Sequence, residues 1–411
     1  MSANGSVIST AEYGRRYDID ALRVIAFSLL ILYHVGMFYV YDWGWHVKSA
    51  YQSEWLQLPM LFSNQWRMSL LFVISGLAVS FVWSRYSPGQ LALKRTWRLG
   101  LPLVFGMAVI VAPQPYYEAL GKGIIEPGFI DFWVRYLSFD DFPGEAWGGE
   151  NIATWTWNHL WYLPYVLFYT LLLIPLAMLF DGPLKPVREG FRSLRGASIV
   201  VVPILPLMIY GLFVYPKFPY ISHTLIDDWY AHAMYGTLFL YGYLVGRDQG
   251  FWDELRRMRK LLLVLAIAAF GLFLAQREFV GDDPGIVLET AGMASIYLNR
   301  WLWIITLFAW GYHLLNRPMG WVKYATAAVF PWYILHQTIT VVLGAELAKF
   351  ELGPVLEPIL VLGGTIAGCL VLYEYVIRRV PVLRPLFGLP YRTRRRSRGN
   401  EEGAASAAPS V

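Results

Sequence analysis

Apolar stretches long enough to cross a membrane follow one another along almost the whole of this 411-residue chain, separated by polar connectors. A transmembrane helix needs about 20 largely apolar residues, so runs of this length predict membrane spans. We therefore predict an all-α polytopic membrane protein, built as a bundle of about ten transmembrane helices. The predicted spans cover approximately residues 21–41, 66–83, 97–113, 159–180, 198–215, 230–245, 261–275, 301–315, 325–347 and 354–377.

The composition excludes an ordinary soluble enzyme. Charged residues make up 15% of the chain and hydrophobic residues 56%, whereas a soluble globular chain carries roughly 25% charged residues. The 18 Trp, 27 Tyr and 24 Phe also give too much apolar surface for a solvated, disordered chain. The single cysteine, Cys369, excludes an intramolecular disulfide, a Cys-rich zinc site and an iron-sulfur cluster.

The positive charges predict how the chain is oriented. If the first span begins in the cytoplasm, every second connector and the C-terminal tail face inward, and these segments hold most of the 34 Lys and Arg. This asymmetry is the positive-inside pattern of a multi-pass protein of a bacterial inner membrane, with both termini cytoplasmic. Topology and contact with membrane lipid therefore explain the basic residues, and nucleic-acid binding is not expected.

Three regions follow from these patterns. Residues 1–20 are predicted to form a cytoplasmic N-terminal segment, 21–390 the transmembrane domain, and 391–411 a cytoplasmic tail that cannot bury a core and is expected to be disordered. Two outer connectors, 42–65 and 114–158, are long and aromatic, which predicts a cap. Aromatic rings suit the faces of sugars, although Trp and Tyr also collect at membrane interfaces.

Two ionisable residues lie within the first span, where such residues are costly and usually functional. Arg23 and His34 share nearly one helix face and lie about 16 Å apart along the axis. With Ser28 and Tyr33 they form a polar track that starts near the cytoplasm and passes the midplane. The alternatives are snorkelling of Arg23 to lipid phosphates and a hydrogen bond of His34 within the bundle, but an imidazole is also the usual general base.

A second histidine, His336, lies at a similar depth in the ninth span, within YILHQT. Two histidines at one level, with Gln337 beside them, predict a proton-handling centre, so His34 and His336 are the candidate catalytic residues. No metal site is predicted, because no third ligand is evident. Glu374 lies nearer the inner surface, where Arg378 at i+4 indicates a salt-bridged helix end.

The inner end of the third span carries a cluster of cations. Arg95 and Arg98 have the i,i+3 spacing that shares one helix face, and guanidinium groups bind phosphate bidentately. The pair therefore suits a ligand that carries phosphate groups. Anchoring at the inner membrane surface explains the same cluster equally well.

The second and fourth spans complete the candidate residues. His159 and Trp161, in NHLWYL, open the fourth span at the outer surface, and Ser75 lies beside Gly76 in LLFVISGL. A glycine lets two helices approach closely, so Gly76 is expected to serve packing. His159, Trp161, Ser75 and Gln337 are the candidates for substrate binding, and Ser75 and Gln337 also for stabilising an oxyanion.

Four motifs taken together resemble the integral-membrane acyltransferase-3 family. They are Arg23 followed after ten residues by His34, LLFVISGL of the second span, RTWRLGLPL of the third, and YILHQT of the ninth. The resemblance covers nearly all of the chain. NHLWYL and the closing YEYVIRRVPVLRPLFG are most similar to the glucan biosynthesis protein C branch, the periplasmic glucan succinyltransferases. Phe168 and Tyr169 lack the upstream acid of the family's polysaccharide O-acetyltransferases, which also favours the glucan branch.

The resemblance implies a membrane-bound O-acyltransferase that moves an acyl group, succinyl or acetyl, from cytoplasmic acyl-CoA to a hydroxyl of a periplasmic glucan or other carbohydrate. Acyl-CoA would be a co-substrate, and no permanently bound cofactor is expected. On this hypothesis Arg95 and Arg98 hold the CoA phosphates and Arg23 lines the pantetheine channel. His34 would deprotonate the attacking hydroxyl, with a covalent acyl-histidine as the alternative.

A different class of function fits the same residues. A transporter or flippase for a glycan or a lipid-linked sugar would also need a polar track and outer aromatic loops. A sensory or scaffold protein would not need Arg23, His34 and His336 to converge. Dependence on acyl-CoA separates the enzyme from the transporter, and a homo-oligomer is compatible with either.

Overall fold

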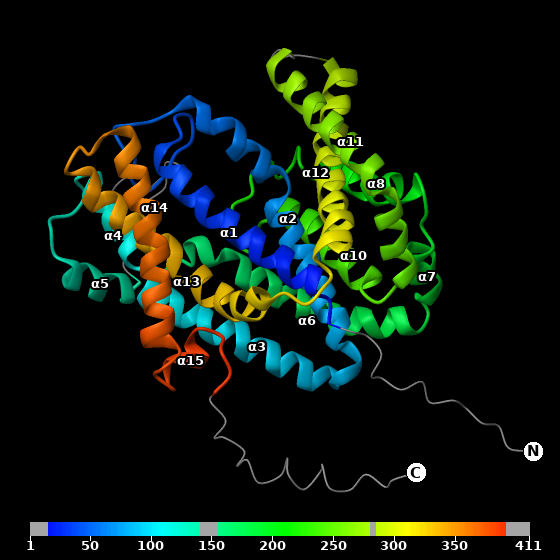
Figure 1. Ribbon diagram of the computed structural model, residues 1–411, viewed down its shortest axis with the longest axis horizontal. Helices are drawn as coiled ribbons and strands as arrows, with labels where there is room; N and C mark the ends of the chain where they lie inside the picture. Colours follow the sequence, from blue (N-terminus) through cyan, green and yellow to red (C-terminus); the bar gives the residue numbers. More distant parts are fainter. Residues whose placement is uncertain (1–14, 140–154, 280–284, 392–411) are drawn as a thin grey trace, which may run out of the picture.

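The structure, a computed structural model, describes residues 15–139, 155–279 and 285–391, and its regular elements within these ranges are helices (Figure 1). An isolated parallel bridge joins Val40 to Ser53. The all-α prediction is confirmed. The α-helices are α1 (Tyr17–Tyr39), α2 (Gln57–Val82), α3 (Pro88–Phe105), α4 (Pro113–Gly121), α5 (Phe129–Leu137), α6 (Tyr162–Asp181), α7 (Lys185–Arg192), α8 (Ser198–Phe213), α9 (Trp229–Ala231), α10 (Thr237–Val245), α11 (Gln249–Phe279), α12 (Gly285–Leu315), α13 (Gly320–Ala348), α14 (Gly353–Val371) and α15 (Leu383–Leu386).

Short helical segments of other pitch join several of these helices. The 3₁₀ segments are η1 (Glu54–Leu56), η2 (Trp83–Arg85) and η4 (Asn158–Trp161), and the π-helical segments are η3 (Gly106–Val111), η5 (His232–Gly236) and η6 (Leu372–Ile377). Segment η3 links α3 to α4, and η6 extends α14. A π-helical turn widens the helix and leaves some backbone carbonyls without their usual partner.

Seven helical segments of the described chain are long and apolar enough to cross a membrane. They cover 17–39, 54–85, 88–121, 158–181, 249–279, 320–348 and 353–377. Helix α8 is also apolar but has only 16 residues. Each of the ten predicted stretches is mainly helical, although α1 ends at Tyr39 and α8 at Phe213, before the predicted ends at 41 and 215. The count of ten spans and the sides of the two termini stay predictions.

Several helices extend beyond the apolar stretches that predicted them. Helix α2 begins at Gln57 rather than near residue 66, and α11 begins at Gln249 rather than near 261. Hydropathy detects the part of a helix that is apolar enough for lipid, whereas amphipathic turns continue the helix beyond it. The predicted outer connector 114–158 likewise includes α4 and α5. Its residues 140–154, with Trp147, lie outside the described ranges, as do residues 1–14 and the predicted tail from 392 onward.

Glycines allow α2 and α10 to pack backbone against backbone. A Cβ atom added at Gly76 would collide with the carbonyl oxygen of Phe239, and one at Gly242 would collide with that of Val73. No side chain fits at either position without moving a helix. The expectation that Gly76 serves packing is therefore confirmed.

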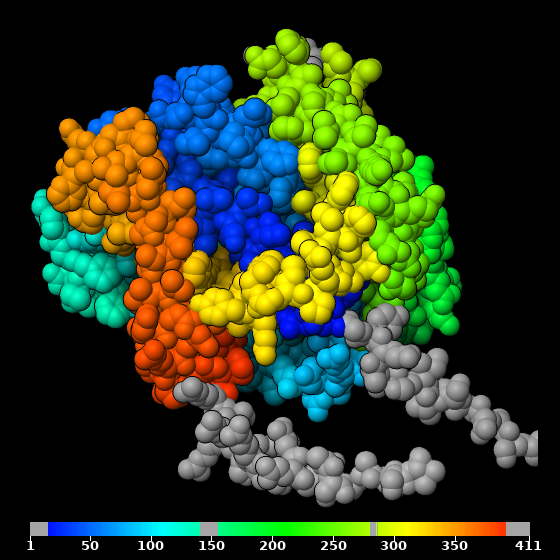
Figure 2. Space-filling model, viewed as in Figure 1, coloured from blue at the N-terminus to red at the C-terminus, as the bar shows by residue number. Residues whose placement is uncertain are grey.

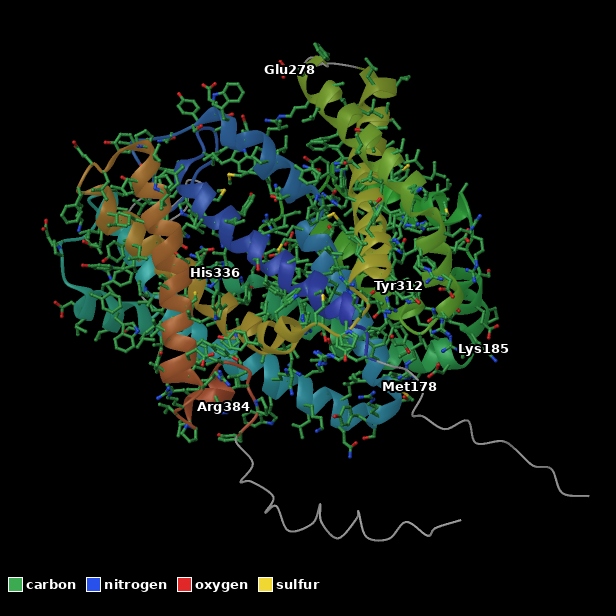
Figure 3. The ribbon with its side chains drawn as sticks, viewed as in Figure 1. Met178, Lys185, Glu278, Tyr312, His336 and Arg384 are labelled. Carbon is green, nitrogen blue, oxygen red and sulfur yellow. The ribbon has the colours of Figure 1, made fainter. Side chains whose placement is uncertain are left out.

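Helix α1 lies among the helices that build the site. It packs against α2, α12, α13 and α14. Figure 2 shows it in blue between α14 in orange and α12 in yellow. In Figure 3, His336 of α13 lies left of centre at mid-height, with Arg384 and Lys185 lower in the view and Glu278 at its top. The site is thus held inside the bundle, between its two ends.

Candidate active site

Two histidines from helices far apart in the sequence form a hydrogen-bonded pair. His34 Nδ1, on α1, lies 2.8 Å from His336 Nε2, on α13. The two ring planes are nearly parallel, at 4°. His336 is fully buried, whereas His34 is partly exposed. His34 is therefore the member of the pair that a substrate can reach.

The backbone around His336 fixes its tautomer. His336 Nδ1 lies 2.7 Å from the carbonyl oxygen of Tyr333 and 3.2 Å from that of Trp332. A carbonyl can only accept a hydrogen bond, so Nδ1 carries the proton and Nε2 of the neutral ring is an acceptor. His34 Nδ1 then donates to His336, and His34 Nε2 keeps its lone pair. This nitrogen is the atom that can take a proton from a substrate hydroxyl.

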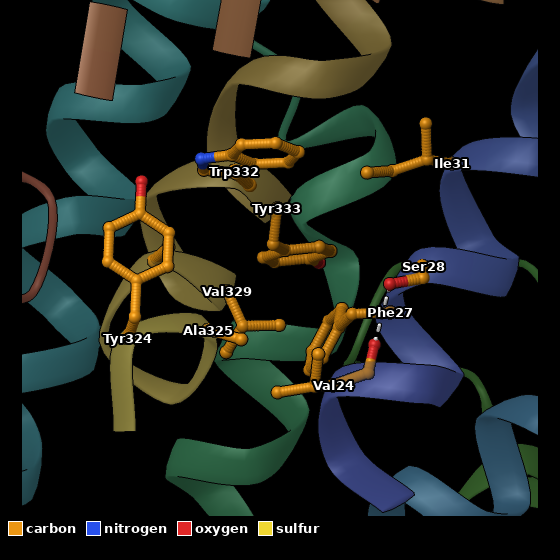
Figure 4. A pocket seen from close by; sticks show the side chains of 10 residues that line it. Val24, Phe27, Ser28, Ile31, Tyr324, Ala325, Val329, Trp332 and Tyr333 are labelled. Atoms are coloured by element: carbon orange, nitrogen blue, oxygen red, sulfur yellow. Dashed lines mark hydrogen bonds between the residues drawn. The ribbon is translucent and has the colours of Figure 1, made fainter. Parts of the chain in front are cut away.

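An apolar cavity of about 130 Å³ lies between α1 and α13 (Figure 4). Its lining positions recur every three or four residues, so the next turn of the same faces carries His34 on α1 and His336 on α13. Arg23 directly precedes the first lining residue of α1. The cavity therefore lies between the level of Arg23 and the histidine pair. The lining residues are Val24, Phe27, Ser28, Ile31, Tyr324, Ala325, Ala328, Val329, Trp332 and Tyr333.

One cavity residue offers an unused hydrogen-bond donor. The indole Nε1 of Trp332 is buried and has no hydrogen-bond partner among the described residues. A buried donor without a partner is costly, and a ligand carbonyl would satisfy it. The cavity lining thus combines an apolar surface with a residue whose buried donor has no partner in the described chain.

The three arginines predicted to bind the co-substrate lie near one another. Arg23 Nη2 donates to Asp20 Oδ1 at 3.1 Å on the same helix. Arg95 and Arg98 of α3 lie close enough to Arg23 for their charges to repel it, and no carboxylate acts on either of them in the described chain. The fold thus gathers cationic groups from α1 and α3 at the Arg23 end of the cavity.

A lysine holds the loop after α1 against the helix end. Lys48 Nζ donates to the carbonyl oxygens of Met37, at 2.9 Å, and Trp43, at 3.0 Å. Burial lowers the pKa of Lys48 to about 8, which leaves the ammonium group mostly protonated at neutral pH. A cation at the C-terminal carbonyls of a helix is stabilising. The loop places the Trp45 ring 5.5 Å from that of His34.

A second polar network, which sequence reasoning missed, lies on the outer side of the predicted topology. His46 Nδ1 donates to Glu118 Oε2 at 2.5 Å, and Asn158 Nδ2 donates to His46 Nε2 at 3.1 Å. Gln337 Nε2 donates to Gln114 Oε1 at 3.0 Å and to Asn158 Oδ1 at 3.2 Å. His46 and Glu118 fell outside the apolar stretches, so the cost of charge in lipid gave no signal. Gln337, predicted to bind substrate, belongs to this network.

His159 is engaged in holding helices together. Its Nε2 donates to the carbonyl oxygen of Ile334 at 3.1 Å, and Gln114 Nε2 donates to its Nδ1 at 3.1 Å. The backbone carbonyl of His159 accepts from the Tyr333 hydroxyl at 2.6 Å. Both ring nitrogens have partners, so this arrangement supports a role for His159, in η4, in positioning α13.

The hydrogen bond of Ser75 and the ring contacts of Trp161 are with residues other than the histidine pair. Ser75 Oγ lies 2.6 Å from the hydroxyl of Tyr162 and links α2 to α6. The Trp161 ring packs on that of His223, with centroids 4.0 Å apart. Burial lowers the pKa of His223 to about 4, so this ring is neutral at pH 7.

Glu374 forms the expected ion pair at the end of its helix. Arg378 Nη1 lies 2.6 Å from Glu374 Oε2, and the Tyr324 hydroxyl donates to Oε1 at 2.6 Å. The interpretation of Glu374 as a salt-bridged helix end is confirmed. Through Tyr324, this pair also borders the cavity.

A family model for an acyltransferase domain, acyltransferase family 3, matches residues 16–374. The chain belongs to the acyltransferase-3 family. The matched range holds the histidine pair, the cavity and the three arginines, and this acyltransferase-3 protein is accordingly an acyltransferase. Its apolar helices and its family together make it a multi-pass membrane protein.

Several relatives of this acyltransferase-3 chain are named glucans biosynthesis protein C. The chain is 26% identical over 386 residues to the protein of that name from Escherichia coli O6:K15:H31 (strain 536) and to that from E. coli K12, with 91% of this chain and 94% of each relative covered. The predicted resemblance to the glucan branch is confirmed. No solved structure matches the chain.

Proposed function

We propose that this acyltransferase transfers a short acyl group, succinyl or acetyl, from cytoplasmic acyl-CoA to a hydroxyl of a periplasmic glucan or another carbohydrate. The observation that carries the proposal is the His34–His336 pair at one end of an apolar cavity that has Arg23 at its other end. A long thioester arm in that cavity would bring its reactive carbonyl to His34. The similarity to glucans biosynthesis protein C supports a glucan acceptor.

The proposed reaction uses His34 Nε2 as a general base. An acceptor hydroxyl gives its proton to this nitrogen while its oxygen forms a bond to the thioester carbonyl carbon. The carbon–sulfur bond then breaks, and the thiolate takes the proton back from His34. His336 accepts the hydrogen bond of His34 Nδ1 throughout, which keeps the ring oriented and fixes its tautomer.

The two ends of the cavity suit the two substrates. Arg95, Arg98 and Arg23 are suited to the phosphates of CoA, because paired guanidinium groups bind phosphate strongly. At the other end, the Trp45 ring lies beside His34 with its indole Nε1 buried and without a partner in the described chain. An aromatic face with a free donor suits a sugar ring. We place the protein in a bacterial inner membrane, with the arginines on the cytoplasmic side.

The test is transfer of radiolabelled acyl groups from acetyl-CoA and succinyl-CoA to a periplasmic glucan extract, with purified protein in liposomes. Label in glucan is expected with the unmodified protein and not with His34→Ala. His313→Ala is the matched control, because His313 is exposed on α12 and outside the site. Retained transfer by a folded His34→Ala protein would end the mechanism. No transfer from either donor by intact, correctly oriented protein would instead favour a transporter or flippase.

A further inference from the structure

Arg67 is a buried cation beside the proposed site. It lies on α2 with 3% of its surface exposed. Its guanidinium carbon lies 3.8 Å from the centroid of the Tyr33 ring, and Nη1 is 3.4 Å from Ser63 Oγ. Its Nε is buried without a hydrogen-bond partner in the described chain. No carboxylate of the described residues pairs with this arginine or acts on its charge.

A permanently charged group in this position needs an anion. Burying a cation costs free energy unless a partner offsets the loss of water, and a guanidinium group cannot escape by losing its proton. Stacking on Tyr33 offsets only part of that cost. Within a membrane span, such a residue is a functional candidate by default.

The other arginine at this level of the bundle is used differently. Arg300 of α12 donates from Nε to the backbone carbonyl of Gln65 at 2.9 Å and contacts the sulfur of Met234. It therefore helps to pack α12 against α2. Arg67 lacks an equivalent carbonyl partner at its Nε, so packing does not explain it.

Arg67 lies within reach of the far end of a short acyl group held at His34. The Tyr33 and His34 rings are 5.9 Å apart, so the guanidinium carbon lies within about 10 Å of the His34 ring. The charge of Arg67 also acts on both His34 and His336. A reacting thioester carbonyl would lie about 3 Å from His34. A four-carbon diacid adds about 4 Å, and a charge-assisted hydrogen bond to Arg67 adds about 2.8 Å. Together these lengths cover the separation of about 10 Å between the His34 ring and the Arg67 guanidinium carbon. The oxyanion of the reacting carbonyl would form nearer to His34.

We infer that Arg67 is the residue that selects between the two acyl groups of the proposed function, because it binds a carboxylate at the far end of the acyl group. The inference rests on the proposed function and names its donor. The bound carboxylate supplies the anion that the described chain does not provide for Arg67. An acyl group that ends in a methyl group would leave the Arg67 cation unpaired. The cost of this unpaired charge would disfavour such a donor.

The test compares succinyl-CoA with butyryl-CoA, because the two acyl groups have the same length and differ in a carboxylate or a methyl end. With the unmodified protein we expect kcat/KM for glucan acylation to be at least about tenfold higher with succinyl-CoA. Arg67→Gln is expected to reduce this ratio by about tenfold or more while butyryl transfer is retained. Arg67→Lys should keep part of the preference, and Arg300→Lys is the control that should keep all of it.

The possible outcomes distinguish failure of the Arg67 inference from failure of the proposed acyltransferase function. Transfer from both donors with equal efficiency by the unmodified protein would overturn the role of Arg67 without touching acyl transfer itself. Equal loss of both donors in a folded Arg67→Gln protein would indicate an oxyanion or structural role and would also overturn it. No transfer from any acyl-CoA by the unmodified protein would reject the proposed function. Where Arg67→Gln does not fold, Arg67→Lys replaces it: a reduced preference for succinyl-CoA supports the inference, and an unchanged preference overturns it.

Discussion

His34 donates a hydrogen bond from Nδ1 to Nε2 of His336, 302 positions further along the chain, and the backbone carbonyls beside His336 set the direction of that bond. The arrangement leaves the lone pair of His34 Nε2 available to substrate. It resembles the base and orienting residue of a catalytic triad, with a buried neutral imidazole in the place of the carboxylate.

Removing the orienting histidine tests this relationship. His336→Leu takes away the acceptor for His34 Nδ1, and we expect kcat to fall by about 10²- to 10³-fold, because an unoriented base is a poor one. His336→Gln offers an amide oxygen as an acceptor and should retain more activity. Both variants are compared with unmodified protein by initial rates of label transfer at saturating acyl-CoA. Equal activity of His336→Leu and the unmodified protein would remove His336 from the mechanism.

Filling the cavity tests whether it holds the donor arm. Ala328 lines the cavity and is buried, whereas its neighbour Ala327 is exposed. Ala328→Phe should raise KM for acyl-CoA by about tenfold or more, since a loss of about 1.4 kcal/mol of binding has that effect. Ala327→Phe should not change it. An unchanged KM in a folded Ala328→Phe protein would place the donor arm elsewhere.

Neutralising the arginines of α3 tests phosphate binding. Arg95→Gln and Arg98→Gln should each raise KM for acyl-CoA and should weaken inhibition by adenosine 3′,5′-bisphosphate, which carries phosphates but no pantetheine arm. The effect should diminish as ionic strength rises, because salt screens charges near the surface. Arg85→Gln, at an exposed arginine of η2 just before α3, is the control. Equal inhibition of all variants would contradict the assignment.

The close packing of α2 against α10 at Gly76 predicts how a substitution there changes the stability of the fold. Gly76→Ala forces a methyl group against the Phe239 carbonyl and should destabilise the fold by about 1–3 kcal/mol, as overpacking does. Gly271→Ala is the control, because nothing lies near a Cβ at that position of α11 and alanine is the better helix former. Thermal unfolding of both variants in one detergent measures the difference. A Gly76→Ala protein as stable as the unmodified one would mean that the helices separate freely.

The pKa of His223 predicts a pH dependence of stability. Its folded-state pKa is lowered from 6.5 to about 4 by burial, so the unfolded chain binds more protons between these values. Stability contributed by the neutral ring is present above pH 6.5 and is lost as the pH falls toward 4. The unfolding temperature should therefore decline more steeply in this window than it does for His223→Gln. Parallel declines would show that other groups dominate.

Much of the candidate site was predictable because charge is rare inside apolar helices. Arg23, His34 and His336 stood out for that reason. Helical spacing predicted a common face for Arg23 and His34, and position within the spans predicted a similar depth for His34 and His336. His46 and Glu118 were not predictable in this way, since they lie in connectors where polar residues are common. The orientation of His159 was also hidden, because its partners Ile334 and Gln114 come from other helices.

The sequence by itself determined an all-helical membrane protein and the placing of Arg23 and His34 on one face of α1, because hydropathy and the 3.6-residue repeat act locally. The tertiary structure decided which side chains meet. It joined His34 to His336 across α1 and α13, gathered Arg95 near Arg23, and left Arg67 buried without a carboxylate from any described residue. These are contacts between segments far apart in the chain, and helix packing, which no local pattern encodes, is the physical cause that selects them.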